Sequence, residues 1–388
     1  MHIVITPRDI SGLTVGYPLR TKLEKSDGLR MKSRKSMYCL LAIVVVASLF
    51  FGPVASTYAD GEKIIPSVPY HKQQSQFYCE YASLEMVFDY YGVDIPQQEL
   101  VAVENMPGFQ YASNGKATEY YWTAVVREAR FSNLSTSYEF YKGSRITGYN
   151  ERDLGYAAFW YGNETCWLED LKDLIDEGYP IIVLQWFDFY EEAGHVRVVI
   201  GYDDTTGEVI FHDPWDRGQS ALLYYGQGTT IEERTLGEKS RLSYDDFISL
   251  WNYWGTYSAT FVAPWEVDIS VESVATGEYN VTATVTYPCP EPFHSWGGWP
   301  PALSTKATIS LPEGLTLALG EVPTKPGPSL WGGDSFTFIW NVVAEEEGEY
   351  TISVQAEGLV TNVDGHGNLY TDRIGGIGEA SLRLPLPE

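Results

Sequence analysis

The hydrophobic pattern of this 388-residue chain changes near Pro264, and that change limits the folds open to it. Before Pro264, segments with helical spacing come first and buried strands follow. Beyond it, short alternating runs are separated by turns rich in Pro and Gly. Helices followed by an antiparallel sheet predict an α+β domain. The alternating runs predict an all-β sandwich of immunoglobulin type. We therefore expect two folded domains, residues 60–264 and residues 265–388.

In the first domain, five segments carry an apolar face at helical spacing. These expected helices are residues 79–91, 96–104, 117–131, 166–177 and 243–254. Valine- and isoleucine-rich runs predict strands at 181–186, 195–202 and 208–212. Residues 132–163 have no firm period, so we expect a long irregular excursion of the kind that is often functional.

The second domain is expected to contain strands and turns only. Its alternating runs are residues 267–271, 279–285, 305–311, 335–343 and 348–356. No helix and no cluster of catalytic residue types is visible in it. We expect this domain to bind a partner, the cell surface or the edge of the first domain.

The first 59 residues have the composition of an export signal. Basic residues precede the 14-residue apolar segment 38–51, and Ala55–Ala59 supplies a small-x-small cleavage pattern. A membrane-spanning helix needs ~20 apolar residues, which this segment does not reach. We expect a secreted or extracytoplasmic protein cleaved near Ala59, or a membrane-anchored one if the segment is uncleaved.

The charge balance excludes several classes of partner. The chain has 26 Lys and Arg against 52 Asp and Glu, a net charge of -26. So acidic a surface repels nucleic acid and anionic membranes. We expect no nucleic-acid partner and a peptide or protein substrate.

Cysteine is scarce, with four residues in the whole chain. Cys39 would be removed when the export signal is cleaved. Cys79 opens the first expected helix. Cys166 and Cys289 either form one bridge between the domains or are two separate buried thiols.

Cys79, His195 and Asp213 are the parts of a cysteine hydrolase. A thiol reacts as its thiolate, which a helix N-terminus and a nearby imidazolium both stabilise. His195 begins a valine-rich strand, and Asp213 follows 18 residues later, after one hairpin. The Asp213 carboxylate would therefore lie beside His195, where we expect it to hold the Nδ1–H group.

Gln73, six residues before Cys79, is the expected oxyanion donor together with the backbone N–H of Cys79. Gln74 and Gln76 are its rivals, and spacing favours Gln73. The rival bases are His71 and His212, of which His212 should point away from the face of Asp213. No group of His, Cys and Asp has metal-ligand spacing, so we expect neither a metal nor a cofactor.

Several blocks of sequence, in this order, resemble the motifs of the C39-like cysteine peptidases. They are Val68–Gln73, Cys79 with Ala82–Gly92, Gly178–Val183, Gly194–Asp203 and His212–Trp215. The resemblance covers about residues 66–264. It implies a papain-like fold and a Gln/Cys/His/Asp site, with Gln73, Cys79, His195 and Asp213 at the corresponding positions.

One departure separates this chain from that family pattern. Glu80 and Tyr81 follow Cys79 where the family commonly has a small pair of residues. An acid beside the thiol could disfavour the thiolate, narrow the pocket or point to solvent. The alternative function is therefore a non-catalytic secreted or surface binding protein on a papain-like scaffold. In the loop before His195, Glu191 and Glu192 would favour a basic peptide as substrate.

Overall fold

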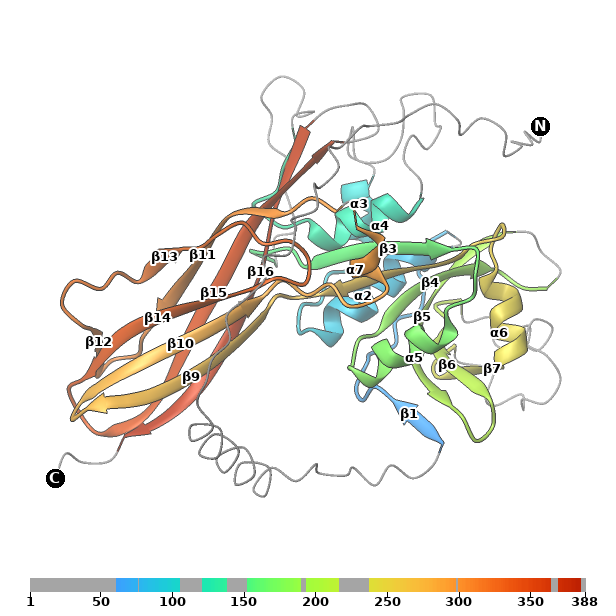
Figure 1. Cartoon of the computed structure of the whole chain (residues 1–388). Helices are drawn as coiled ribbons and strands as arrows, with labels where there is room; N and C mark the ends of the chain where they lie inside the picture. Colours follow the sequence, from blue (N-terminus) through green and yellow to red (C-terminus); the bar gives the residue numbers. More distant parts are fainter. Residues whose placement is uncertain are drawn as a thin grey trace, which may run out of the picture. The chain divides into compact units, whose positions relative to one another are not determined.

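The computed structural model describes eight segments of the chain, all of them beyond residue 60 (Figure 1). They are residues 61–75, 77–104, 121–137, 152–189, 193–215, 237–297, 299–363 and 369–384. The expected export signal, Gln76, Glu191 and Glu192 lie outside them. Within these segments, no helix combines the length and the apolar character needed to cross a membrane.

The part before Pro264 is built from helices around one antiparallel sheet. Its helices are α2 (Cys79–Tyr90), α3 (Gln97–Glu104), α4 (Tyr121–Arg130), α5 (Leu168–Asp176) and α6 (Tyr244–Trp251). The sheet has seven strands, in the order β3-β8-β4-β5-β6-β7 with β1 paired to β5. Those strands are β1 (Glu62–Ile64), β3 (Ala157–Asn163), β4 (Ile181–Trp186), β5 (Gly194–Asp203), β6 (Glu208–His212), β7 (Ser240–Ser243) and β8 (Tyr257–Ala263). The predicted helices and the three predicted strands of this part are confirmed, with small shifts at their ends.

Strands β4 and β5 form the centre of the sheet because their residues are apolar on both faces. Val183, Val196 and Val198 are all at most 2% exposed, and α2 packs against β5. Ser83 of α2 donates its hydroxyl to the carbonyl of Val196 at 3.5 Å. The start of α2 is thus held against the start of β5.

The prediction of an irregular excursion over residues 132–163 is wrong for the last residues of that range. Residues Ala157–Asn163 form the edge strand β3, which pairs with β8. The period-2 pattern is missing because β3 carries the bulky pair Trp160 and Tyr161, only partly buried, between buried neighbours. Near its beginning, Thr136–Ser137 forms the short strand β2. Residues 138–151 lie outside the described segments.

The part beyond Pro264 contains two antiparallel sheets. One has the order β12-β14-β10-β9 and the other β13-β11-β15-β16-β2. The strands are β9 (Glu266–Ala275), β10 (Glu278–Thr286), β11 (Ala302–Ser310), β12 (Leu315–Leu317), β13 (Thr324–Pro326), β14 (Ser335–Ala344), β15 (Gly348–Val363) and β16 (Leu369–Leu384). The alternating runs are confirmed as strands. The expectation of no helix is wrong, because Phe293–Trp296 forms the single-turn helix α7, too short to show a helical period.

The two parts of the chain share one core. Strand β2 pairs with β16, and Gly155 donates its backbone N–H to the carbonyl of Arg373 at 2.8 Å. The buried apolar residues of both parts belong to one continuous cluster. Arg127 and Arg130 of α4 are buried, and so is Asp372 of β16. Burial raises the pKa of Asp372, and the positive charge of Arg127 opposes this rise.

Candidate active site

Cys79 is the first residue of α2, and it is buried, with 7% of its surface exposed. Tyr78 precedes it as N-cap and supplies no side-chain hydrogen bond to the helix. Cys79 and Ser83 lie one turn apart on the same face of α2. Because Ser83 contacts the carbonyl of Val196, this face is turned toward the strand residue that follows His195.

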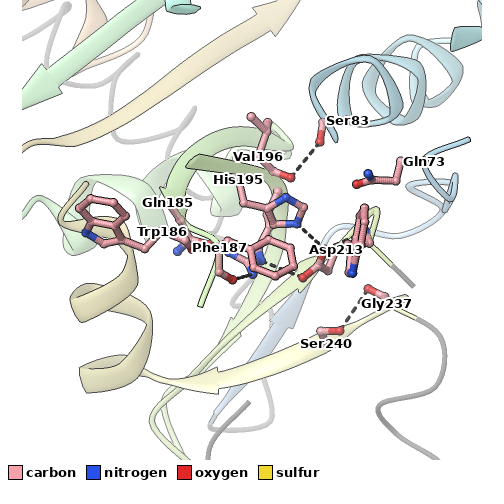
Figure 2. Close-up of polar contacts among 12 residues, drawn as sticks. Gln73, Ser83, Gln185, Trp186, Phe187, His195, Val196, Asp213, Gly237 and Ser240 are labelled. Atoms are coloured by element: carbon pink, nitrogen blue, oxygen red, sulfur yellow. Dashed lines mark hydrogen bonds and ion pairs between the residues drawn. The ribbon is translucent and has the colours of Figure 1, made fainter. Parts of the chain in front are cut away.

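His195 and Asp213 meet through the hairpin of β5 and β6. The two strands pair Val198 with His212, so the residue after β6 comes back beside the start of β5. Nε2 of His195 lies 2.7 Å from Oδ1 of Asp213 (Figure 2). The expected partner atom Nδ1 is therefore wrong, because the ring is turned so that Nε2 faces the carboxylate. Both side chains are at most 2% exposed.

The carboxylate of Asp213 is held in its charged form. Burial alone would raise its pKa, but the positive charge of Arg197, with His195, holds the pKa well below its usual range. Nε of Arg197 donates to Oδ2 of Asp213 at 2.9 Å, and the backbone N–H of Trp215 donates to Oδ1 at 2.8 Å. A charged Asp213 fixes the ring orientation of His195 and stabilises its protonated form.

Arg197 is a functional residue for which the sequence reading gave no role. It is 1% exposed and also donates to Oε1 of Gln185, the carbonyl of Trp186 and the carbonyl of Phe187 at 3.0, 3.1 and 2.8 Å. The sequence signal for Arg197 is its position two residues after His195, since residues two apart in a strand share a face. An arginine buried on the same face as His195 needs a carboxylate to compensate its charge. Asp213, which directly follows β6, supplies that carboxylate.

Gln73 lies on the loop before α2, and it is 7% exposed. Its backbone N–H donates to the carbonyl of Pro214 at 2.9 Å, which ties this loop to the residue after Asp213. Its side chain donates one N–H to the carbonyl of Ser75 at 2.7 Å. In Figure 2 the carboxamide end of Gln73 points to the side where His195 lies. The rival Gln74 is exposed.

A second glutamine brackets Gln73. Gln97 of α3 is 1% exposed, and its Nε2 donates to the carbonyl of Lys72 at 3.0 Å. Its Oε1 accepts the backbone N–H of Gln74 at 2.9 Å. Gln97 therefore holds the residues on both sides of Gln73, and it also donates to Oε2 of Glu85 at 2.6 Å.

The two rival histidines have other partners. The ring nitrogens of His212 lie 3.1 Å from the carbonyl of Val68 and 3.0 Å from the backbone N–H of Lys239, which donates to Nδ1. Burial lowers the pKa of His212. Nε2 of His71 lies 2.9 Å from Oδ2 of Asp89. Neither ring is placed against Asp213 as His195 is.

One group of side chains could hold a metal ion. The ligand atoms of His71, Glu85 and Asp94 all lie within 4.8 Å of one another. An imidazole with two carboxylates is a donor set that zinc accepts. These residues come from a loop, from α2 and from the connection to α3, so no short sequence spacing revealed them. Burial raises the pKa of Glu85, and His71 and Glu85 already contact Asp89 and Gln97.

The remaining cysteines and Glu80 also have defined places. Cys79, Cys166 and Cys289 are all free thiols, so of the two alternatives for Cys166 and Cys289 the structure has two separate thiols, of which Cys289 is buried and Cys166 half-buried. Burial raises the pKa of Cys166, and it raises that of Cys289 to about 12, which makes both thiols poor nucleophiles. Glu80 is 4% exposed, which excludes the alternative that its side chain points to solvent.

Residues 65–234 match the model of the Peptidase_C39 like family. The resemblance drawn from the motifs is therefore confirmed. Among solved structures, a candidate C39-like peptidase from Bacillus anthracis is 15% identical, over 53% of this chain and 98% of that one, with a TM-score of 0.32. A solution structure from Arabidopsis thaliana is 14% identical, over 33% of this chain and 87% of that one, with a TM-score of 0.19. No curated protein matches the sequence.

Proposed function

We propose that the protein is an exported cysteine peptidase that cleaves a peptide or isopeptide bond. The observation that carries this proposal is the buried contact of 2.7 Å between His195 and Asp213, at the end of β5 against which α2 packs. The family match supports the hydrolase class, and the residues named here support the mechanism that we propose.

In the proposed mechanism, the Cys79 sulfur attacks the carbonyl carbon of the scissile bond. The electron pair of the C=O bond moves to oxygen, where Gln73 and the N–H groups at the start of α2 stabilise the charge. His195 gives its proton to the leaving nitrogen as the C–N bond breaks, which leaves a thioester on Cys79. His195 then takes a proton from water, whose oxygen displaces the sulfur and releases the carboxylic acid.

Asp213 and Arg197 act through His195. Asp213 holds Nε2, which leaves Nδ1 as the ring nitrogen that exchanges protons with the thiol and the leaving group. Arg197 fixes the second oxygen of Asp213 and ties it to the carbonyl groups of Trp186 and Phe187. No step of this mechanism requires a cofactor.

The export signal and the second part of the chain belong to the same proposal. The segment before Ala59 would direct secretion or, if it is uncleaved, anchor the protein in a membrane. We propose that the two sheets beyond Trp265 form an immunoglobulin-like sandwich, since buried residues such as Val281, Val285 and Trp340 alternate with outer ones. Its role would be attachment to a partner or to the cell surface.

Glu80 favours a second candidate function, a binding protein that keeps this scaffold without turnover. A carboxylate buried in the first turn of α2 lies next to the thiol in sequence and disfavours a second negative charge there. Such a protein would bind a peptide at the same place and release it uncleaved.

An electrophilic peptide probe that alkylates active thiols distinguishes the two functions. We expect mass spectrometry to find the probe on Cys79 in the wild type and in a Cys166→Ala/Cys289→Ala variant. His195→Ala should slow this labelling about 100-fold or more, because the imidazole activates the thiol. Folded protein that remains unlabelled at every pH from about 5 to 9, a range that spans the unperturbed thiol pKa, would support the binding protein instead.

A further inference from the structure

The end of the central sheet that carries His195 also carries an aromatic pocket. The pocket has a volume of about 520 Å³, within the range of ligand sites. Trp160 and Tyr161 of β3 line it together with Trp296 of α7, and Asn163, Glu164, Thr256 and Ser295 add polar groups. The helix α7 belongs to the second part of the chain, so both parts of the protein build this pocket.

Strand register gives the distance between the pocket and the catalytic pair. Gly162 of β3 pairs with Ser258 of β8, Ser258 with Leu184 of β4, and Leu184 with Val196 of β5. Asn163 and His195 each lie one residue further toward the same end of the sheet. Three strand spacings separate them, about 14 Å. An extended peptide covers this distance in about four residues.

Three aromatic side chains lie between His195 and the pocket, of which Trp186 and Tyr253 are half-buried and Trp254 is exposed. The Tyr253 hydroxyl packs on Gly194, where an added Cβ would lie 2.9 Å from it. The Trp186 ring is 4.6 Å from the ring of Tyr253 and 5.3 Å from that of Trp254, which is 72% exposed. Tyr253 in turn pairs with Thr256, which lines the pocket. The contacts are therefore continuous from Gly194 to Trp296.

Trp296 is placed to receive a side chain. It is 50% exposed, although its ring lies 5.6 Å from the rings of both Trp160 and Tyr161. A half-exposed tryptophan in a cluster of aromatic rings still has apolar surface to bury. The polar groups at the rim suit a peptide backbone, which carries one donor and one acceptor at most residues.

The geometry points to an extended substrate-binding path, which runs from His195 over Trp186, Tyr253 and Trp254 to the pocket at Trp296. Its occupant is the polypeptide substrate, with an aromatic or long apolar side chain seated in the pocket about four residues from the scissile bond. The cleavage test of this inference rests on the proposed peptidase function. The inference also implies that the second part of the chain contributes to substrate specificity.

The cleavage test uses the full-length protein and a library of tryptic peptides, with mass spectrometry to identify each cut. We expect aromatic and long apolar residues to be enriched about four positions from the cleaved bond. Trp296→Ala should remove this enrichment while cleavage of the other peptides continues. The control is Phe336→Ala, which truncates an aromatic side chain, 37% exposed, on β14 away from the path and should leave the enrichment intact.

A binding test separates this inference from the proposed function. Fluorescence anisotropy compares a labelled dodecapeptide that carries one Trp with the same peptide carrying Ser, on protein with the Cys79→Ala change. We expect the Trp peptide to bind about tenfold more tightly, and Trp296→Ala to remove most of this difference. Absence of cleavage with a retained Trp-dependent difference overturns the peptidase and keeps the path. Equal binding of both peptides, or a difference that Trp296→Ala leaves unchanged, overturns the path.

Discussion

At the scale of single residues, the catalytic pair depends on a buried charge. Asp213 contacts His195 on one oxygen and Arg197 on the other, and none of the three side chains is more than 3% exposed. Burying one carboxylate is costly unless opposite charges and hydrogen bonds compensate for it. The site is therefore sensitive to the removal of any one of these charges.

Asp213→Asn should make the stability of the protein less dependent on pH. The pKa of Asp213 is lowered in the folded state, so its charge stabilises the fold above the unfolded value of about 3.9 and this contribution is lost as pH falls. At pH 7 the variant should be less stable by about 3 to 5 kcal/mol, because Arg197 stays buried without its carboxylate. Urea unfolding at a series of pH values measures the difference, which should shrink below about pH 4. A constant difference down to pH 3 would contradict this account.

At the scale of elements, the sequence predicted most of the fold and the contact between His195 and Asp213. Strands β4 and β5 could be predicted because both of their faces are buried, so Val, Ile and Leu occupy most of their positions. Strand β3 could not be predicted from the sequence, because its bulky, partly buried edge residues interrupt the alternation of apolar and polar positions. Cys79, His195 and Asp213 were found from residue type and spacing. The role of Arg197, and the fact that Nε2 of His195 faces Asp213, could not be predicted, because both depend on how the side chains turn toward one another.

The loop before α2 gives a prediction at this scale, since Gln97 of α3 holds it on both sides of Gln73. Gln97→Met keeps the length of the side chain and removes these hydrogen bonds. We expect kcat to fall by about tenfold, less than the 100-fold or greater loss typical of removing an oxyanion donor, as in Gln73→Ala. In the double variant Gln97→Met should add little, because both changes act on one group. Rates on a cleaved peptide provide the measurement.

The control for this prediction is Gln98→Ala, which removes the exposed neighbour of Gln97 on the same helix. It should leave kcat within about twofold of the wild type, since exposed substitutions away from packed groups change little. Additive losses in the double variant, or equal losses from Gln97→Met and Gln98→Ala, would show that Gln97 has no specific link to Gln73.

At the scale of the whole molecule, the two parts of the chain are joined by buried charges as well as by backbone pairing. Arg127, Arg130 and Arg152 are between 1% and 3% exposed, and Asp372 of β16 is fully buried near them. Arg152 also donates to the backbone carbonyl of Ala129 at the end of α4. The joint is therefore an interior of the protein, and we expect the two parts to unfold together.

Asp372→Ala tests this joint, because it leaves the buried arginines with less compensating charge. We expect the free energy of unfolding to fall by about 3 to 5 kcal/mol, the usual cost when buried charges lose a compensating charge. Loss of the proposed peptidase activity reports on the first part of the chain, and pulsed hydrogen exchange of strands β10 and β14, read by mass spectrometry, reports on the second. The two signals should shift together to lower denaturant concentration, as one cooperative transition requires. Glu349→Ala, which removes an exposed carboxylate paired with Arg383 on the outer strands, should change stability by less than about 1 kcal/mol. If activity is lost while the strand signal keeps its midpoint, the two parts unfold separately and Asp372 supports only one of them.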